Sequence, residues 1–357
     1  MSIVYFLVLL LVLYGLWNIS LRIALKKLTC ARTFSKRTVF EGEEAELIEV
    51  VKNDNPFVIP WLRIETKVSQ YLLFGKQDNL QINHKMYHCS MFTLMPYQQI
   101  RRRHRVRFLH RGSYNLGNAF FTVGDLLGIQ KFHRTQMLEA PVLVFPRILD
   151  ENRIPLPLSQ LLGELVQQRQ LLQDPFFVRG IRLYQPGDPI RDIHWPATAR
   201  TGDVQVRVHD YSAQTKLMVV LNMQLENIQW NDQLPEKDQY ILEYGISLAA
   251  TLCTQMLQNG FSVGFATNMP TDTEDTSTVL LPDTGAAREE ELLSTMARLQ
   301  VKRSEHFPPF LESLSSHSGM DILILSYYDS DSIQEGVRTL REAGNQVSVY
   351  LFQGDIS

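Results

Sequence analysis

The 357-residue chain is long enough for two domains, since a single core seldom grows beyond about 250 to 300 residues. Its composition, 45% hydrophobic and 20% charged, is that of an ordinary globular protein. The net charge of −3 conceals an asymmetry, because residues 1–150 contain 20 Lys/Arg and 11 Asp/Glu, whereas residues 151–357 contain 15 and 27. The basic half suits an anionic surface such as lipid headgroups or nucleic acid, and mutual attraction of the two halves explains the asymmetry equally well.

Three widely spaced cysteines, Cys30, Cys89 and Cys253, form no CxxC pair. Their odd number and spacing argue against a disulfide framework and against a zinc site, and they fit a reducing compartment.

The N-terminus predicts a membrane anchor. Ser2 to Leu21 is a run of 20 residues without a charge, about the length that a helix needs to cross a bilayer. We expect a retained transmembrane helix at residues 1–21 rather than a cleaved signal peptide, because no basic residue precedes the run and no A-x-A site follows it. A basic juxtamembrane segment is expected at residues 22–37, with Arg22, Lys26, Lys27, Arg32, Lys36 and Arg37. An excess of Lys/Arg marks the cytoplasmic side, so the sequence predicts a single-pass protein of the cell inner (cytoplasmic) membrane whose soluble domains face the cytoplasm.

Residues 38–147 read as short strands separated by turn residues, a pattern typical of a β-sandwich-like domain. Within them, Ile100 to His110 is the most basic run, and strand alternation sends Arg101, Arg103, Arg105 and Arg107 to one face. That face suits anionic lipid, or it is a solvated face or a dock for the acidic half of the chain. Nucleic acid is disfavoured, because no aromatic side chains interleave with the arginines.

The periodicity of the apolar residues changes in the second half of the chain. Residues 148–213 are expected to contain a linker helix, near residues 159–174, and a charged segment. Residues 214–357 alternate nearly continuous apolar strands with amphipathic helices, which predicts a mostly parallel sheet covered on both faces. The expected fold class is therefore α+β and multidomain: a transmembrane helix, a β-sandwich-like domain and a Rossmann-like α/β domain.

Motifs of common enzymes are missing from the sequence: it contains no GxxxxGK[ST], no GxGxxG after a strand, no GxSxG and no HExxH. The nearest metal-like group is His84, His88 and Cys89. It lies on an expected strand, where four residues span about 13 Å, too far for two ligands of one zinc ion.

Residues 177–211 concentrate charge and glycine at the expected joint between the two domains. Arg182, Arg191 and Arg200 could form bidentate bonds with Asp188 and Asp192. His194 is the one obvious base within residues 180–200, and no Ser or Cys lies beside it, which disfavours catalysis. Three interpretations remain open: a structural hub between domains, a surface that docks a partner, and a catalytic or small-ligand site.

The same segment resembles the signature of the DUF58 family, roughly G-x-R-x-Y-x-x-G-D-x-x-R-x-I-x-W-x-x-x-A-R. The residues that match it, or that we take as part of the candidate interaction site, are Gly180, Arg182, Tyr184, Gly187, Asp188, Arg191, Asp192, Ile193, His194, Trp195, Ala199 and Arg200. "TVFEGEEAEL" and "LHRGSYNLGNAFFTVGDLLGIQKF" are similar to two further family segments. The resemblance implies a membrane-anchored bacterial or archaeal protein with a C-terminal domain similar to a von Willebrand factor A domain. It also implies an association with a MoxR-type AAA+ ATPase.

A von Willebrand A domain holds Mg²⁺ with D-x-S-x-S after its first strand, since a hard cation takes carboxylate and hydroxyl oxygens. The corresponding residues here are Asn222, Gln224 and Glu226, so we expect a degenerate site without a metal. Asp329 and Asp331 could lie on the same rim.

Taken together, the residues and the resemblance predict a non-enzymatic, membrane-anchored adaptor or scaffold with no cofactor and no catalytic residue. Its expected partner is a protein, for which the resemblance implies the MoxR-type ATPase, in cell-envelope or complex-assembly processes. The alternative is a metal-dependent binding protein or enzyme that uses the rim of the A-like domain.

Overall fold

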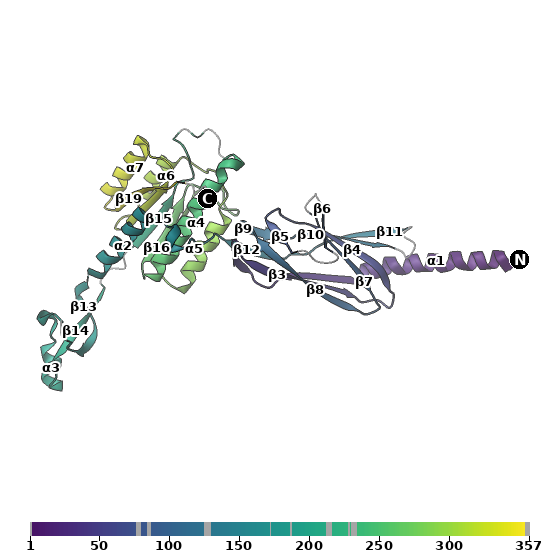
Figure 1. Ribbon diagram of the computed structural model, residues 1–357, viewed down its shortest axis with the longest axis horizontal. Coiled ribbons are helices and arrows are strands. Elements are labelled where there is room, and N and C mark those ends of the chain that lie inside the picture. Colours follow the sequence, from purple (N-terminus) through teal and green to yellow (C-terminus); the bar gives the residue numbers. More distant parts are fainter. Residues whose placement is uncertain are drawn as a thin grey trace. The chain divides into compact units, whose positions relative to one another are not determined.

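The computed structural model describes residues 2–75, 80–83, 87–124, 130–171, 173–185, 188–211, 216–227, 229 and 234–353 (Figure 1). The chain divides into two compact units, residues 1–147 and 148–357, and each is described by itself. The molecule is mixed α/β with several sheets and one apolar N-terminal helix, as the sequence predicts.

The N-terminal helix, α1 (Ser2–Lys27), is long and apolar enough to cross a membrane. Large apolar side chains from Val4 to Ile19 are exposed, whereas Leu21, Ala24 and Leu25 are buried in the first unit. The helix therefore has an outer part without protein cover and a last part inside a protein core.

Two antiparallel sheets form most of the first unit. One has the order β1-β3-β8-β5 and the other β11-β10-β4-β7-β6. Their strands are β1 (Leu28–Phe34), β3 (Glu44–Asn53), β4 (Ile59–Lys67), β5 (Leu72–Phe74), β6 (Leu80–Asn83), β7 (Tyr87–Leu94), β8 (Gln99–Phe108), β10 (Asn118–Gly124) and β11 (Lys131–Met137). A smaller sheet joins β2 (Thr38–Phe40), β12 (Pro141–Phe145) and β9 (Gly112–Asn115).

The two large sheets share one apolar core. Leu28, Cys30 and Val51 of the first sheet pack with residues of β4, β7 and β10 of the second, and the last turns of α1 join the same cluster. On β8, Arg101, Arg103, Arg105 and Arg107 are exposed, as strand alternation predicts.

The boundaries near the membrane segment differ from those expected. The helix continues to Lys27 and β1 begins at Leu28, so residues 22–37 are not a separate basic segment and the sheets begin before residue 38. Arg32 lies buried beside Glu49 rather than at a membrane surface. Local charge cannot reveal this, because the partner of Arg32 lies 17 residues away on another strand.

In the second unit, a five-stranded sheet has the order β17-β16-β15-β18-β19. The strands β15 (Lys216–Leu221), β16 (Ser262–Thr267), β18 (Asp321–Ser326) and β19 (Gln346–Leu351) are parallel, and β17 (Thr278–Asp283) is an antiparallel edge. All six residues of β16 are buried, as expected for a strand covered on both faces.

Helices cover this sheet. They are α4 (Glu236–Gln258), α5 (Ala286–Arg298), α6 (Phe307–Leu314) and α7 (Asp331–Glu342). The sequence prediction missed α6, although Phe307, Phe310, Leu311 and Leu314 have helical spacing and are all buried.

The rest of the unit precedes β15. It comprises the turn η1 (Glu151–Arg153), the helix α2 (Leu156–Leu171), and a separate two-stranded sheet of β13 (Gln173–Leu183) and β14 (Gln205–Tyr211). The turn η2 (Ile190–Asp192) and the helix α3 (Trp195–Thr201) lie between these two strands in sequence.

Candidate functional site

The charged segment forms a β-hairpin with an insertion. In β13 and β14, Gly180 pairs with Val208, Arg182 with Val206 and Leu183 with Gln205. The register shifts between Val178 and Gly180, which marks a bulge, a position that glycine commonly occupies in strands. The Tyr184 NH donates to Val204 O at 2.8 Å and extends the pairing by one step.

An ion pair closes the turn that follows β13. Arg182 donates Nη1 and Nη2 to the two carboxylate oxygens of Asp188, each at 2.7 Å. The Gln185 NH also donates to Asp188, at 2.8 Å. The Arg182 hydrogen bonds, followed by that of the Gln185 NH, lower the pKa of Asp188, so the pair stays charged at neutral pH. A bidentate pair of this kind fixes direction as well as distance, and it ties Asp188 to the end of β13.

His194 starts the short helix α3. Its ring Nδ1 accepts a hydrogen bond from the Ala197 NH at 3.0 Å, and the backbone NH of His194 donates to Gln205 O at 2.7 Å. This bond makes His194 the N-cap of α3. Gly202, with φ of 80°, ends the helix in the left-handed conformation that glycine favours.

Large apolar side chains of the insertion are exposed. Ile190 is 76% exposed and Trp195 is 65% exposed, and Leu183 and Tyr184 are also exposed. Isolated exposed leucines are common, but several large apolar side chains, a tryptophan among them, exposed on one small hairpin are typical of a contact surface.

The remaining predicted residues lie on the same hairpin or outside the described residues. Arg191 Nε lies 3.9 Å from Asp192 Oδ1, and the Arg200 side chain is exposed on α3. Gly187 lies outside the described residues. The structure thus joins Arg182 to Asp188 closely, and it places Arg191 and Arg200 at the surface of the insertion.

A second group of predicted residues, Asn222, Gln224 and Glu226, follows β15 at the end of the parallel sheet. Asn222 Nδ2 donates to Ser326 Oγ at 3.0 Å, and its Oδ1 accepts the Gln224 NH at 2.9 Å. Gln224 Oε1 accepts the Phe307 NH at 2.7 Å, at the start of α6. These buried amides hold together the segments that follow the strands, whereas Glu226 is exposed.

The polar side chains that follow β15 do not fit a magnesium site. Both amide oxygens already accept backbone NH groups, and neither carries the negative charge that Mg²⁺ requires. Asp329 is also engaged, since it accepts from the Ser330 NH and from Gln334 Nε2. Across the described part of the chain, no three His, Cys, Asp or Glu side chains are grouped so as to hold a metal ion.

His88 and Cys89 have structural partners in the first unit, and His84 lies outside the described residues. The His88 ring lies 4.9 Å from that of His104 and 4.7 Å from that of Phe74, and burial lowers the pKa of His88 to about 3. Cys89 Sγ accepts a hydrogen bond from Arg63 Nε at 3.2 Å.

Sequence reasoning missed the charged centre of this cluster, Arg32 and Glu49. Arg32 donates Nε and Nη2 to Glu49 Oε1, at 2.8 and 2.6 Å, and Nη1 to Thr66. Burial raises the pKa of Glu49, but His104, 3.7 Å away, and the Arg32 charge outweigh it and hold the pKa at about 2. The alternation of β3, which places Glu49 among inward-facing residues, is the sequence signal for this centre.

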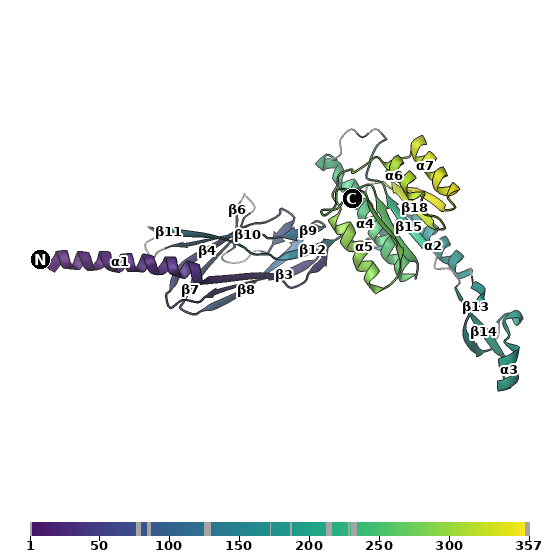
Figure 2. The same cartoon turned by 180° about the vertical axis from the view of Figure 1, so that it is seen from behind.

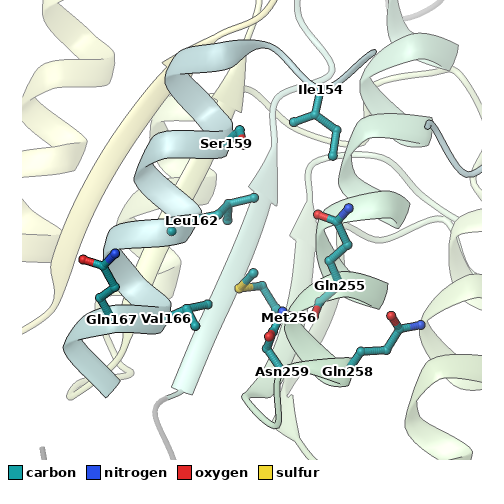
Figure 3. Close-up of a pocket in the computed structure, with 10 residues that line it drawn as sticks. Ile154, Ser159, Leu162, Val166, Gln167, Gln255, Met256, Gln258 and Asn259 are labelled. Atoms are coloured by element: carbon teal, nitrogen blue, oxygen red, sulfur yellow. Dashed lines mark hydrogen bonds between the residues drawn. The ribbon is translucent and has the colours of Figure 1, made fainter. Parts of the chain in front are cut away.

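An open pocket of about 530 Å³ lies between α2 and α4 (Figure 3). Leu162 and Val166 of α2 face Met256 of α4, and glutamine and asparagine amides surround them. Ser159 supplies the one hydroxyl among the lining residues, and none of them is a His, Asp, Glu or Lys. Since general acid–base chemistry needs a titratable group, this lining suits binding rather than catalysis.

The fold and the hairpin define a mixed α/β protein whose charged signature is built as a separate hairpin. Residues 180–318 match the family described as "Protein of unknown function DUF58". The matched segment begins in β13 and ends just before β18.

None of the curated proteins compared with the chain matches it. Among solved structures, the CARDB domain of a Pyrococcus furiosus protein is 15% identical with a TM-score of 0.22, covering 33% of this chain and 93% of that one. A non-cellulosomal cohesin from Archaeoglobus fulgidus is 7% identical with a TM-score of 0.24, covering 32% and 91%. These scores are too low to indicate a shared fold or function.

Proposed function

We propose that the protein is a non-enzymatic, membrane-anchored adaptor that binds a protein partner through its signature hairpin. The observation that carries this proposal is the exposure of Ile190 and Trp195 on a hairpin in which Arg182 binds Asp188 through two hydrogen bonds. Tryptophan is enriched among the residues that contribute most to protein interfaces, and a surface fixed before binding loses less conformational entropy when it binds.

The partner we propose is a MoxR-type AAA+ ATPase, on the ground of the resemblance to the DUF58 family. The hairpin combines exposed apolar groups with the charges of Arg191 and Arg200 at its surface. Such a surface suits a protein with a complementary apolar pocket and acidic rim, because interfaces typically have an apolar centre surrounded by polar groups.

We also propose that residues 216–352 form a von Willebrand factor A-like domain. Support comes from the strand order, in which the first strand lies at the centre and the third is an antiparallel edge. The amides of Asn222 and Gln224 then occupy the positions at which such domains bind their metal, so this domain acts as a scaffold without a cofactor.

For location, we propose a single-pass protein of the cytoplasmic membrane, anchored by α1, with both units in the cytoplasm. The basic residues Arg22, Lys26 and Lys27 at the end of α1 support this orientation.

The test is a binding measurement between the purified full chain in detergent and the purified MoxR-type ATPase of the same source. We expect Trp195→Ala to weaken binding about tenfold or more, because truncating a central interface tryptophan commonly costs 2 kcal/mol or more. Tyr240→Ala is the matched control, since it removes an exposed aromatic side chain from α4 and should leave affinity unchanged. Absence of binding by the wild type, or equal binding by Trp195→Ala, would refute the docking role.

A further inference from the structure

The connection between α1 and the first unit is not a flexible linker. Leu21, Ala24 and Leu25 of α1 are buried in the core formed by the two large sheets. The next residue after the helix, Leu28, is already the first residue of β1. No linker separates the apolar helix from the sheets.

Side chains of the sheet region also bind the end of the helix. Arg134 donates Nη1 to the carbonyls of Leu25 and Leu28, at 3.0 and 3.1 Å. Asn55 Nδ2 donates to Ala24 O at 3.1 Å. Because carbonyls at a helix C-terminus have no partner within the helix, these bonds satisfy them and fix the helix to the unit.

Two loops lie beside this junction, residues 54–58 between β3 and β4 and residues 95–98 between β7 and β8. Asn53 Nδ2 donates to the carbonyls of Phe57 and Met95, at 2.8 and 2.9 Å, which joins the two loops. The Tyr97 NH donates to Asn55 O at 3.2 Å. Figures 1 and 2 both show α1 leaving the first unit at the end where these strands turn.

The same loops expose large apolar side chains. Tyr97 is 68% exposed, Met95 is 55% exposed and Phe57 is 39% exposed. Tyr97 has φ of 56°, a left-handed conformation that costs a non-glycine residue on the order of 1 kcal/mol, so the bonds between the loops hold it against strain. We call Phe57, Met95 and Tyr97 the rim.

Helix geometry gives the depth of the rim. The exposed apolar side chains of α1 continue to Ile19 and Ile23, and Ala24, which Asn55 contacts, follows them, about 7.5 Å beyond Ile19 along the helix axis. The headgroup layer on each side of a bilayer is about 5 to 7 Å thick. With the apolar part of α1 in the hydrocarbon, the rim lies in the headgroup layer, where tyrosine is enriched.

We propose that the rim docks into the headgroup layer of the membrane that α1 spans, so that helix and rim hold the first unit in a fixed orientation on the lipid surface. The inference rests on the membrane anchoring in the proposed function. It also assigns the lipid contact to the rim rather than to the far part of the arginine run on β8. Arg101 to Arg107 are seven residues of extended strand that lead away from the junction, so Arg107 lies about 20 Å beyond Arg101, farther than charges act through physiological salt, about 8 Å.

Nitroxide labels on the full chain in nanodiscs of phosphatidylcholine and phosphatidylglycerol test the proposal. Labels would be attached at Met95→Cys and Tyr97→Cys on the rim, at Leu13→Cys in α1, and at Leu109→Cys, an exposed apolar position at the opposite end of β8. The native cysteines are buried, and burial raises the pKa of Cys30 and Cys253 to about 12, so they compete poorly for the label.

Accessibility of each label to oxygen and to a water-soluble nickel chelate is then measured by power-saturation electron paramagnetic resonance. We expect both rim labels to favour oxygen, as the Leu13→Cys label does, and the Leu109→Cys label to favour nickel. Rim labels that favour nickel while Leu13→Cys favours oxygen would overturn the rim contact and leave the anchor intact. A Leu13→Cys label that favours nickel would overturn the anchor itself. Rim labels shielded from both reagents would indicate a protein contact, such as a second copy, and would also overturn the lipid contact.

Discussion

Each unit buries a polar network, and the two networks differ in charge. In the first unit, Arg32, Glu49 and His104 bring ionisable groups into the core between the sheets. In the second, Asn222, Gln224 and Asn268 connect the strand ends through neutral amides. The difference teaches that a charged network makes its unit sensitive to pH and strongly sensitive to the loss of one partner, whereas an amide network fixes loops independently of pH and loses less stability when one partner is removed.

The largest effect is expected when one partner of the buried ion pair is removed. Glu49→Gln leaves the Arg32 guanidinium buried without a counter-charge, so the first unit should lose about 3 to 5 kcal/mol of stability. Scanning calorimetry of the full chain in detergent measures this as a lower melting temperature.

Glu65→Gln is the matched control for that variant. Glu65 also lies 2.6 Å from an arginine, Arg63, but both side chains are partly exposed. Exposed pairs contribute about 0 to 1 kcal/mol, so the control should hardly shift the transition. Equal shifts in the two variants would show that burial does not distinguish the pairs.

The second expected effect is a loss of folding stability at acidic pH. Burial lowers the pKa of His88 to about 3 from 6.5, so the unfolded chain binds a proton more readily than the folded one between these values. Stability is therefore complete above about pH 6.5 and falls with decreasing pH, by at most about 1.4 kcal/mol per pH unit. Glu49, with its pKa lowered to about 2 from 4.5, adds a loss of the same sign below pH 4.5.

Melting temperatures between pH 6.5 and 4.5 isolate the His88 contribution. His88→Gln should flatten this dependence, and His133→Gln, at an exposed position of β11, should retain the wild-type slope. A slope that His88→Gln leaves unchanged would assign the acid sensitivity to another group.

A smaller effect is expected in the amide network. Asn222→Ala removes the bonds to Ser326 and to the Gln224 NH, which should destabilise the second unit by about 1 to 3 kcal/mol. The loss should be the same at pH 5 and pH 8, because no ionisable group is changed. A loss that varies strongly with pH would show that the network is coupled to a charge.

No effect is expected from magnesium. Ligands that bind the folded state raise its melting temperature, and the amides at Asn222 and Gln224 offer no carboxylate for Mg²⁺. Millimolar Mg²⁺ or Mn²⁺ should therefore leave both thermal transitions of the wild type in place. A rise of several degrees in the second unit would favour the metal-dependent alternative.

In the second unit, the sequence predicted the strands of the five-stranded sheet and the helices α4, α5 and α7, because these follow from local periodicity, but it missed α6. Near α1, the sequence predicted less of the structure. Leu21, Ala24 and Leu25 have the spacing of a buried helix face, but the flanking Arg22 and Lys26 hide it, and only the tertiary structure places that face among the sheets.

The candidate site was predicted in part. The pairing of Arg182 with Asp188 was among the bonds expected from residue type, since an arginine and an aspartate stand six residues apart around a turn. The hairpin was not foreseen, because β13 and β14 pair across more than twenty intervening residues of irregular structure and a short helix. The exposure of Trp195 was not foreseen either, because tryptophan is usually largely buried in proteins.

Hydrogen exchange of the full chain, with and without the purified ATPase, tests the adaptor role most directly. Docking on the hairpin predicts that binding slows exchange of the amides from Ile181 to Val206, and that Trp195→Ala removes this protection. The buried strand β15 should exchange at the same rate in both states. Protection confined to the helices around the parallel sheet, with an unchanged hairpin, would contradict the account.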